Sequence, residues 1–186
     1  FLSFSNMQGI IVCGQMPAHA AGRLSVFIFD NWHEIPRASD PPNYPYGSDI
    51  ICAMLSPDQI EAKLDRILLK VQKPGRYVGG ELNSTVKDWD AVQTRVAFVF
   101  PDIYDIGVSN VGIKILYDQV NQRDDALAER AYAPWLDMEA LMREHGIPLY
   151  ALESKQPLAC FDLFCNATPY AKIYTNALNV LDLAGV

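Results

Sequence analysis

The 186-residue chain lacks several features that would assign it to a functional class at once. No apolar stretch approaches the roughly 20 residues that cross a bilayer as a helix. There is no run of Lys and Arg, and the formal net charge of −7 argues against a nucleic-acid surface. The opening has no basic stretch followed by a long apolar core, as a secretory signal has. These absences predict a cytoplasmic protein without a membrane segment or a nucleic-acid partner.

Motifs for metal binding, redox chemistry and nucleophilic catalysis are missing as well. His19 and His33 are isolated, with no companion at metal-ligand spacing. No Ser-His-Asp or Cys-His arrangement can be assembled from the motifs of the chain. The sequence therefore predicts no metal site, no catalytic residues and buried thiols in a reducing compartment. The cysteines show no paired short spacing of the zinc or redox type: Cys13, Cys52, Cys160 and Cys165.

What the sequence does contain is a strand, a loop and a helix in direct succession. Val96 to Phe100 is an unbroken apolar run, too short for a helix, which predicts a strand buried on both faces of a parallel sheet. Asp102 to Gly107 form a polar loop. Apolar residues then recur at helical spacing from Val108 to Val120, and Ser109 is placed to cap this helix. The succession is the first half of a βαβ unit.

Further strands and helices alternate along the chain. Three more strands are expected at 129–133, 148–152 and 161–165. Helices are expected from a capping box at Ser56, over 137–145 with Gly146 as the left-handed cap, and from Thr175 or Asn176 onward. This alternation predicts an α/β fold, a Rossmann-like (flavodoxin-like or cobalamin-binding-like) parallel sheet with flanking helices. Because a last strand is expected after the closing helix, the domain reads as incomplete at its C-terminus.

The chain divides into three parts by pattern. Residues 1–53 carry no sustained period and read either as a poorly patterned extension or as non-native sequence ahead of a start at Met54. Under both alternatives they are expected to contribute little to the core. Residues 54–90 form an N-terminal helix and a Gly-containing loop. Residues 91–186 form the α/β domain. Within the loop, Gly75 to Ser84 indicates either a turn that needs positive φ or a cradle for an anionic group, and the turn is favoured.

The loop after the central strand is where function is first expected. In open α/β sheets the ligand crevice lies beyond the carboxyl ends of the strands. Two carboxylates there suit either Mg²⁺ or the capping of backbone N–H groups, and the further acidic residue and Lys of a phosphoacceptor site are not evident. The candidate cofactor-binding residues are Asp102, Tyr104, Asp105, Gly107, Ser109 and Asn110.

Three long blocks of the sequence carry a resemblance. They are KPGRYVGGELNSTVKDWD (Lys73 to Asp90), VAFVFPDIYDIGVSNVGIKILYDQVNQR (Val96 to Arg123) and LAERAYAPWLDMEALMREHGIPLYALESKQPLACFD (Leu127 to Asp162). They resemble the N-terminal region of a radical SAM protein family whose leading domain is cobalamin-binding-like, and the resemblance runs from Leu55 to Val186. It implies a longer parent enzyme with a C-terminal radical SAM barrel. That barrel, the implied partner of this domain, would hold a [4Fe–4S] cluster on a Cys-x₃-Cys-x₂-Cys motif, together with S-adenosylmethionine. This chain has no such motif.

The resemblance also bears on cobalamin. In cobalamin-binding domains the first strand is followed by Asp-x-His-x-x-Gly, whose His takes the lower cobalt position. The matching hexapeptide here is Asp102 to Gly107, and Tyr104 stands where the His would be. A phenol is a poor cobalt ligand at neutral pH, which leaves a His-off mode or no cobalamin at all. A second departure lies at Phe164 to Ile173, where the family usually has a Gly-Phe-x-Leu-Gln-Tyr-Glu-like run.

Two functions of different classes follow. The first is an accessory ligand domain of a radical SAM enzyme, which binds a corrinoid or part of an unknown substrate. The second is a non-catalytic structural module that caps the barrel and mediates domain contacts. The fragment itself is not expected to be catalytic under either.

Overall fold

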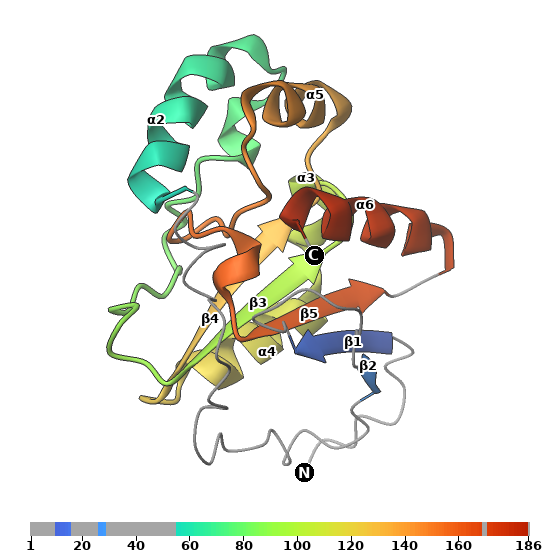
Figure 1. Cartoon of the computed structure of the whole chain (residues 1–186). Coiled ribbons are helices and arrows are strands. Elements are labelled where there is room, and N and C mark those ends of the chain that lie inside the picture. The colour runs from blue at the N-terminus through green and yellow to red at the C-terminus, as the bar shows by residue number, and fades with distance from the viewer. Residues whose placement is uncertain (1–9, 16–25, 29–54, 169–170, 186) are drawn as a thin grey trace, which may run out of the picture.

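The computed structural model describes residues 10–15, 26–28, 55–168 and 171–185. Its sheet has five strands in the order β2-β1-β5-β3-β4. The strands are β1 (Ile10–Gln15), β2 (Val26–Ile28), β3 (Thr94–Phe100), β4 (Ala126–Tyr132) and β5 (Leu163–Thr168). β5, β3 and β4 are parallel, whereas β1 is antiparallel to both β5 and β2. The three parallel strands with flanking helices confirm the expected Rossmann-like α/β class (Figure 1).

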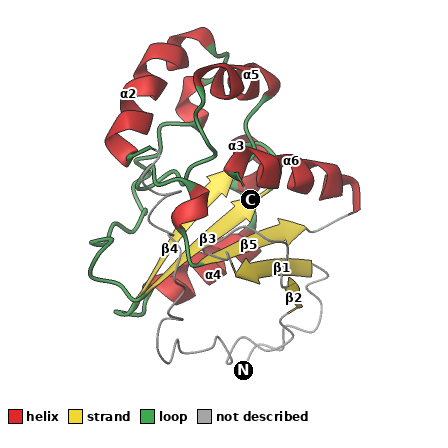
Figure 2. Ribbon diagram, in the orientation of Figure 1, coloured by secondary structure: helices red, strands yellow, loops and turns green. Residues whose placement is uncertain are grey.

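The helices surround this sheet (Figure 2). They are α2 (Pro57–Ile67), α3 (Tyr104–Gly107), α4 (Val111–Asn121), α5 (Leu136–His145) and α6 (Tyr174–Ala184). Short 3₁₀ turns lie at Leu68–Lys70, Pro74–Arg76, Leu158–Cys160 and Ala171–Ile173. α4 and α6 lie on opposite faces of the sheet (Figure 1). No helix within the described ranges is long and apolar enough to cross a membrane.

β3 is the centre of the core, as the apolar run predicts. Val96 to Phe100 are all buried, and Ala97 and Val99 have no exposed surface. Both faces of this strand are covered because helices pack on each side of a parallel sheet. The capping box at Ser56 is also confirmed: its side chain accepts from Gln59 N, and the Gln59 side chain accepts from Ser56 N. Gly146 and Gly185 end α5 and α6 with φ of 60° and 74°.

Several expected boundaries are wrong. Residues 148–152 form no strand: Tyr150 makes only an isolated bridge to Pro157, and Leu152 N donates to the carbonyl of Arg130 at the edge of β4. The segment therefore covers the edge of β4 through side chains and isolated backbone hydrogen bonds rather than through a ladder. The alternation of residues in the sequence does not distinguish these two arrangements. The predicted loop 102–107 contains the short helix α3, and α4 begins at Val111 rather than Val108. α6 begins at Tyr174, one residue before the predicted start.

Two strands fall inside the extension at residues 1–53. β1 pairs with β5 over six residues, from Ile10 opposite Thr168 to Gln15 opposite Leu163. β1 includes the short apolar run Ile10 to Cys13, which is too short and isolated to form a sustained pattern. The remainder of the extension, including His19 and His33, lies outside the described residues, and its small contribution to the core stays a prediction.

The prediction that the cysteines are buried free thiols is wrong for two of the four. Cys160 and Cys165 are both disulfide-bonded. Cys165 lies in β5, where its backbone is opposite residue 13 of β1. Spacing along the chain carries no information about cysteines that the fold brings near one another. The side chains of Cys13 and Cys52 lie outside the described residues.

Candidate functional site

The candidate site lies at the carboxyl ends of β3 and β4. Residues 73–85, called here the covering segment, cross this end of the sheet and are held almost entirely by side-chain contacts. Tyr77 accepts from Trp135 N through its hydroxyl at 3.1 Å and from the Tyr150 hydroxyl through its carbonyl at 3.2 Å. Thr85 N donates to the Tyr117 hydroxyl at 2.6 Å. The covering segment therefore packs against α4, the residue before α5 and Tyr150, on the β4 side of the sheet.

Tyr104 joins α3 to the covering segment. Its hydroxyl donates to Glu81 Oε1 at 2.5 Å, and its ring meets the Tyr132 ring edge-on with centroids 5.2 Å apart. Burial, with the neighbouring Glu81 carboxylate adding to it, raises the pKa of Tyr104 to about 12. Tyr104 is therefore a protonated hydrogen-bond donor to a protein carboxylate at neutral pH.

Arg130, in the middle of β4, is the centre of a buried ionic network. Its Nε lies 2.7 Å from Glu153 Oε1, and its NH1 lies 2.8 Å from Glu81 Oε2. Its guanidinium lies 4.5 Å from the ring centre of Tyr117. Burial opposes the charge of Arg130, but Glu153, Tyr132 and Glu81 together outweigh that effect, so the pKa of the guanidinium is raised. Glu81 thus links Arg130 to Tyr104 and fixes the covering segment over β4.

A second buried carboxylate, Glu129, projects from β4 beside this network. Its Oε2 accepts from Ser154 Oγ at 2.6 Å and from Ser154 N at 3.1 Å. Burial raises the pKa of Glu129 to about 7, although the Ser154 hydrogen bonds oppose the shift. Lys155, adjacent to Ser154, donates to the carbonyls of Val78 and Leu152 at 2.7 and 2.6 Å. The turn at 152–156 is therefore bound both to the strand and to the covering segment.

Asp105, predicted to contact a ligand, is engaged by two cations of the covering segment. Lys73 Nζ lies 2.9 Å from Asp105 Oδ1, and Arg76 Nε pairs with Oδ2. Hydrogen bonds from Lys73 and Arg76 lower the pKa of Asp105 to about 2. The sequence showed no Lys positioned near these carboxylates, because the two cations lie about 30 residues earlier in the chain.

The other predicted site residues have local structural roles. Asp102 Oδ1 accepts from Ile103 N at 2.7 Å, which agrees with the capping alternative. Asn110, and not Ser109, caps α4: its Oδ1 accepts from Ile113 N at 3.0 Å. Ser109 Oγ instead donates to the carbonyl of Ile106. Gly107 is buried, and a Cβ there would lie 2.5 Å from the Tyr132 ring. The fold brings all six predicted residues to one edge, and their role toward a ligand stays a prediction.

The Gly-containing loop is confirmed as a turn that needs positive φ. Gly79 has φ of 68° and Gly80 has φ of 74°. A Cβ on Gly79 would lie 2.2 Å from the Leu152 carbonyl oxygen. The backbones at Gly79 and Leu152 are therefore too close together for any residue with a side chain at position 79.

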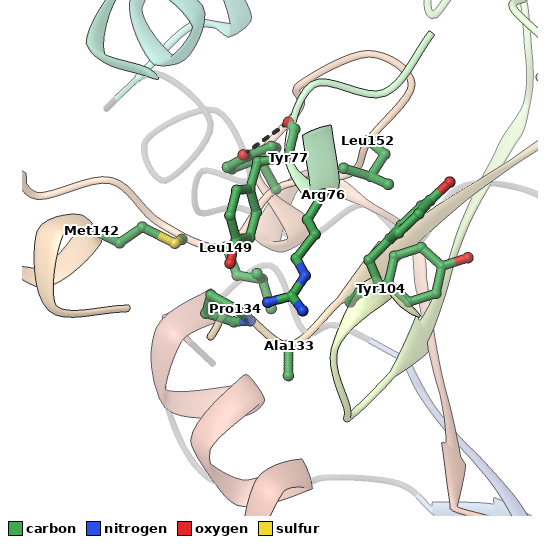
Figure 3. A pocket seen from close by; sticks show the side chains of 10 residues that line it. Arg76, Tyr77, Tyr104, Ala133, Pro134, Met142, Leu149 and Leu152 are labelled. Atoms are coloured by element: carbon green, nitrogen blue, oxygen red, sulfur yellow. Dashed lines mark hydrogen bonds between the residues drawn. The ribbon is translucent and has the colours of Figure 1, made fainter. Parts of the chain in front are cut away.

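A pocket lies between the covering segment, the end of β4 and the start of α5 (Figure 3). It has a volume of about 20 Å³, room for a single water-sized group and not for a cofactor. Four tyrosines line it, and the guanidinium of Arg76 points toward Ala133 and Pro134 (Figure 3). The tyrosines are Tyr77, Tyr104, Tyr132 and Tyr150.

The residues of this edge offer no lower ligand to the cobalt of a corrinoid, and a His-off mode stays a prediction. Tyr104, at the position of a corrinoid's lower ligand, stays protonated and donates a hydrogen bond to Glu81. In the described ranges no group of three or more His, Cys, Asp or Glu side chains is arranged to hold a metal ion.

Sequence reasoning missed the network of Arg130, Glu129, Glu153 and Glu81. The available signal was the run Glu129-Arg130 in the middle of a strand whose other residues are apolar or small. Adjacent residues of a strand point to opposite faces, so two adjacent charges on a fully buried strand each need a polar partner on their own face. That requirement predicts a polar network, although the sequence does not identify the partners.

Residues 112–186 match the family described as radical SAM proteins, N-terminal. The match covers less than half of the chain, from α4 through α6, and supports a relationship to radical SAM proteins. No curated protein and no solved structure matches the chain.

Proposed function

We propose that this chain is a non-catalytic accessory domain of a radical SAM protein and contacts the radical SAM barrel through the carboxyl edge of its sheet. The family match over 112–186 supports the accessory role. On this proposal the [4Fe–4S] cluster and S-adenosylmethionine belong to the barrel, and this domain supplies neither.

The observation that carries the proposal is the apolar surface at this edge. Each connection that follows a parallel strand exposes large apolar side chains: Ile106 after β3, Trp135 and Leu136 after β4, and Tyr174 and Leu178 after β5. Leu136 is 72% exposed and Leu178 is 68% exposed. Large apolar side chains gathered on one side of a domain are typical of an interaction surface.

α5 and α6 hold part of this surface together. Asn179 Nδ2 donates to Glu139 Oε2 at 3.0 Å, and Arg143 NH1 lies 2.8 Å from Asp182 Oδ2. These pairs place the two helices side by side in the same direction, so their first turns lie at the same end (Figure 1). The exposed residues of those turns are Leu136 on α5 and Tyr174 and Leu178 on α6.

The polar groups of the edge favour this structural role over corrinoid binding. Tyr104, Arg130 and Asp105 each have protein partners, which leaves no lower ligand for cobalt. The experiment is a titration of the chain with hydroxocobalamin, followed by its visible spectrum, for wild type and Tyr104→His. We expect no binding by wild type. A spectrum with a new cobalt–nitrogen band in wild type would overturn the structural role.

Contact with the barrel is tested separately, with a radical SAM barrel from the same gene supplied in trans. The double variant Leu136→Ser/Leu178→Ser should weaken the association at least about tenfold, because each lost apolar contact contributes roughly 1 kcal/mol or more. The matched control is Val86→Ser, which alters a side chain that is 81% exposed near the amino end of β4. Equal weakening by both variants, or a gene that encodes no barrel, would contradict the proposal.

A further inference from the structure

Arg76 has a guanidinium that the domain only partly uses. Its Nε pairs with Asp105, while its two terminal nitrogens point into the pocket between the covering segment and the start of α5 (Figure 3). The Arg76 side chain is 11% exposed. The Tyr77 hydroxyl lies near enough to contribute to the raised pKa of Arg76, after the larger contribution of Asp105. Four N–H bonds extend from the two terminal nitrogens, and a single phenol oxygen cannot accept them all.

The start of α5 contributes positive potential near these N–H bonds. Asp105 is shared between Lys73 and Arg76, so it does not occupy the whole guanidinium of Arg76. Pro134 in the pocket wall leads directly into α5, a helix of ten residues whose N-terminus carries a partial positive charge. The nearby Asp137 is already engaged, because its oxygens accept from Gln72 N and Met138 N.

The size and walls of the pocket narrow the ligand class. A volume of about 20 Å³ has room for one water-sized atom group, such as a carboxylate oxygen that reaches the guanidinium, so the rest of the ligand would lie outside the pocket and a whole cofactor is excluded. Planar carboxylates bind the guanidinium fork with two parallel hydrogen bonds. Aromatic rings line the approach, so the remainder of the ligand can be apolar.

We propose that Arg76, in the pocket beside the start of α5, binds the carboxylate group of a small organic acid. The site goes beyond the proposed accessory role, since it needs no barrel and no cofactor. It also gives a concrete form to the anionic-ligand alternative for the Gly75 to Ser84 loop, with Arg76 rather than the glycine backbone as the binding group.

The test is an NMR titration of the whole chain with sodium acetate, with sodium chloride at equal ionic strength as the reference. We expect saturable shifts of the Arg76 Nε–Hε and Trp135 amide signals with acetate and none with chloride. Arg76→Lys keeps the charge but loses the fork, and should weaken binding at least about tenfold. The matched control is Arg143→Lys, at a surface arginine of α5 that pairs with Glu139 and Asp182.

Arg76→Gln provides a second variant if Arg76→Lys does not fold. It removes the guanidinium, so the saturable shifts with acetate should disappear. Equal shifts with acetate and chloride, unchanged affinity in Arg76→Lys, or retained binding in Arg76→Gln would each overturn the proposal. Because hydroxocobalamin and the barrel are absent from this titration, its failure leaves the accessory role intact.

Discussion

Gly79 lies so close to Leu152 that a Cβ on the glycine would be 2.2 Å from the leucine carbonyl oxygen. This contact joins the covering segment to the turn beside β4, and Lys155 Nζ donates to the carbonyls on both sides of it. The packing of the covering segment on this turn therefore requires a residue without a side chain at position 79.

Gly79→Ala and Gly80→Ala form a matched pair that isolates this contact. Both glycines have positive φ, which costs an alanine roughly 1–2 kcal/mol. A Cβ on Gly80 meets no atom within 4 Å, whereas a Cβ on Gly79 meets backbone. Chemical denaturation should show Gly79→Ala to be the less stable variant by a clear margin. Equal unfolding free energies for the two variants would contradict the close approach.

Glu129→Gln should change how stability depends on pH. The pKa of Glu129 rises from 4.5 to about 7 in the folded domain, so the folded state binds this proton more tightly than the unfolded chain. The stabilisation is therefore full below pH 4.5 and is lost as the pH rises to about 7. At pH 8 the amide avoids a buried charge and still accepts from Ser154, so Glu129→Gln should be more stable than wild type, on the order of 2 kcal/mol.

Denaturation curves at several pH values check this expectation. The difference between Glu129→Gln and wild type should shrink toward zero as the pH falls from 8 to 4.5. A constant difference over this range would show that Glu129 is not the titrating group.

Asp105→Asn should loosen the covering segment. The pKa of Asp105 falls from 3.8 to about 2 because Lys73 and Arg76 donate to its carboxylate. Its stabilising contribution is therefore present above pH 3.8 and is lost as the pH falls through about 2. Hydrogen exchange of backbone amides in residues 73–85 should speed up in the variant at neutral pH, and high salt should reduce the difference because Asp105 is exposed. Unchanged exchange at low salt would show that the ion pairs do not hold the segment.

Val99→Asp should abolish folding. Val99 has no exposed surface in the central strand, and an aspartate there would be an unpaired charge in the core. Circular dichroism during heating should show no cooperative transition. Val86→Asp, at a side chain that is 81% exposed, should melt like wild type. A normal melting curve for Val99→Asp would contradict the position of this strand in the core.

The sequence alone determined the features that arise from local pattern. The apolar run at Val96 to Phe100 fixed the central strand, since only a sheet covered on both faces buries such a run. Ser56 and Gly146 marked helix ends, because capping hydrogen bonds and left-handed backbone depend on residues a few positions apart. The same local reasoning located the carboxyl edge of the sheet as the place to look for function.

Only the tertiary structure decided what occupies that edge. Glu81 meets Tyr104 and Arg130, residues 23 and 49 positions away, and Lys73 and Arg76 meet Asp105 across about 30 residues. Residues 148–152 have the composition of a strand, yet they cover the edge of β4 without joining the sheet. Side-chain pairing between distant segments depends on how the chain crosses over the sheet, and the order of residues along the chain carries no record of that path.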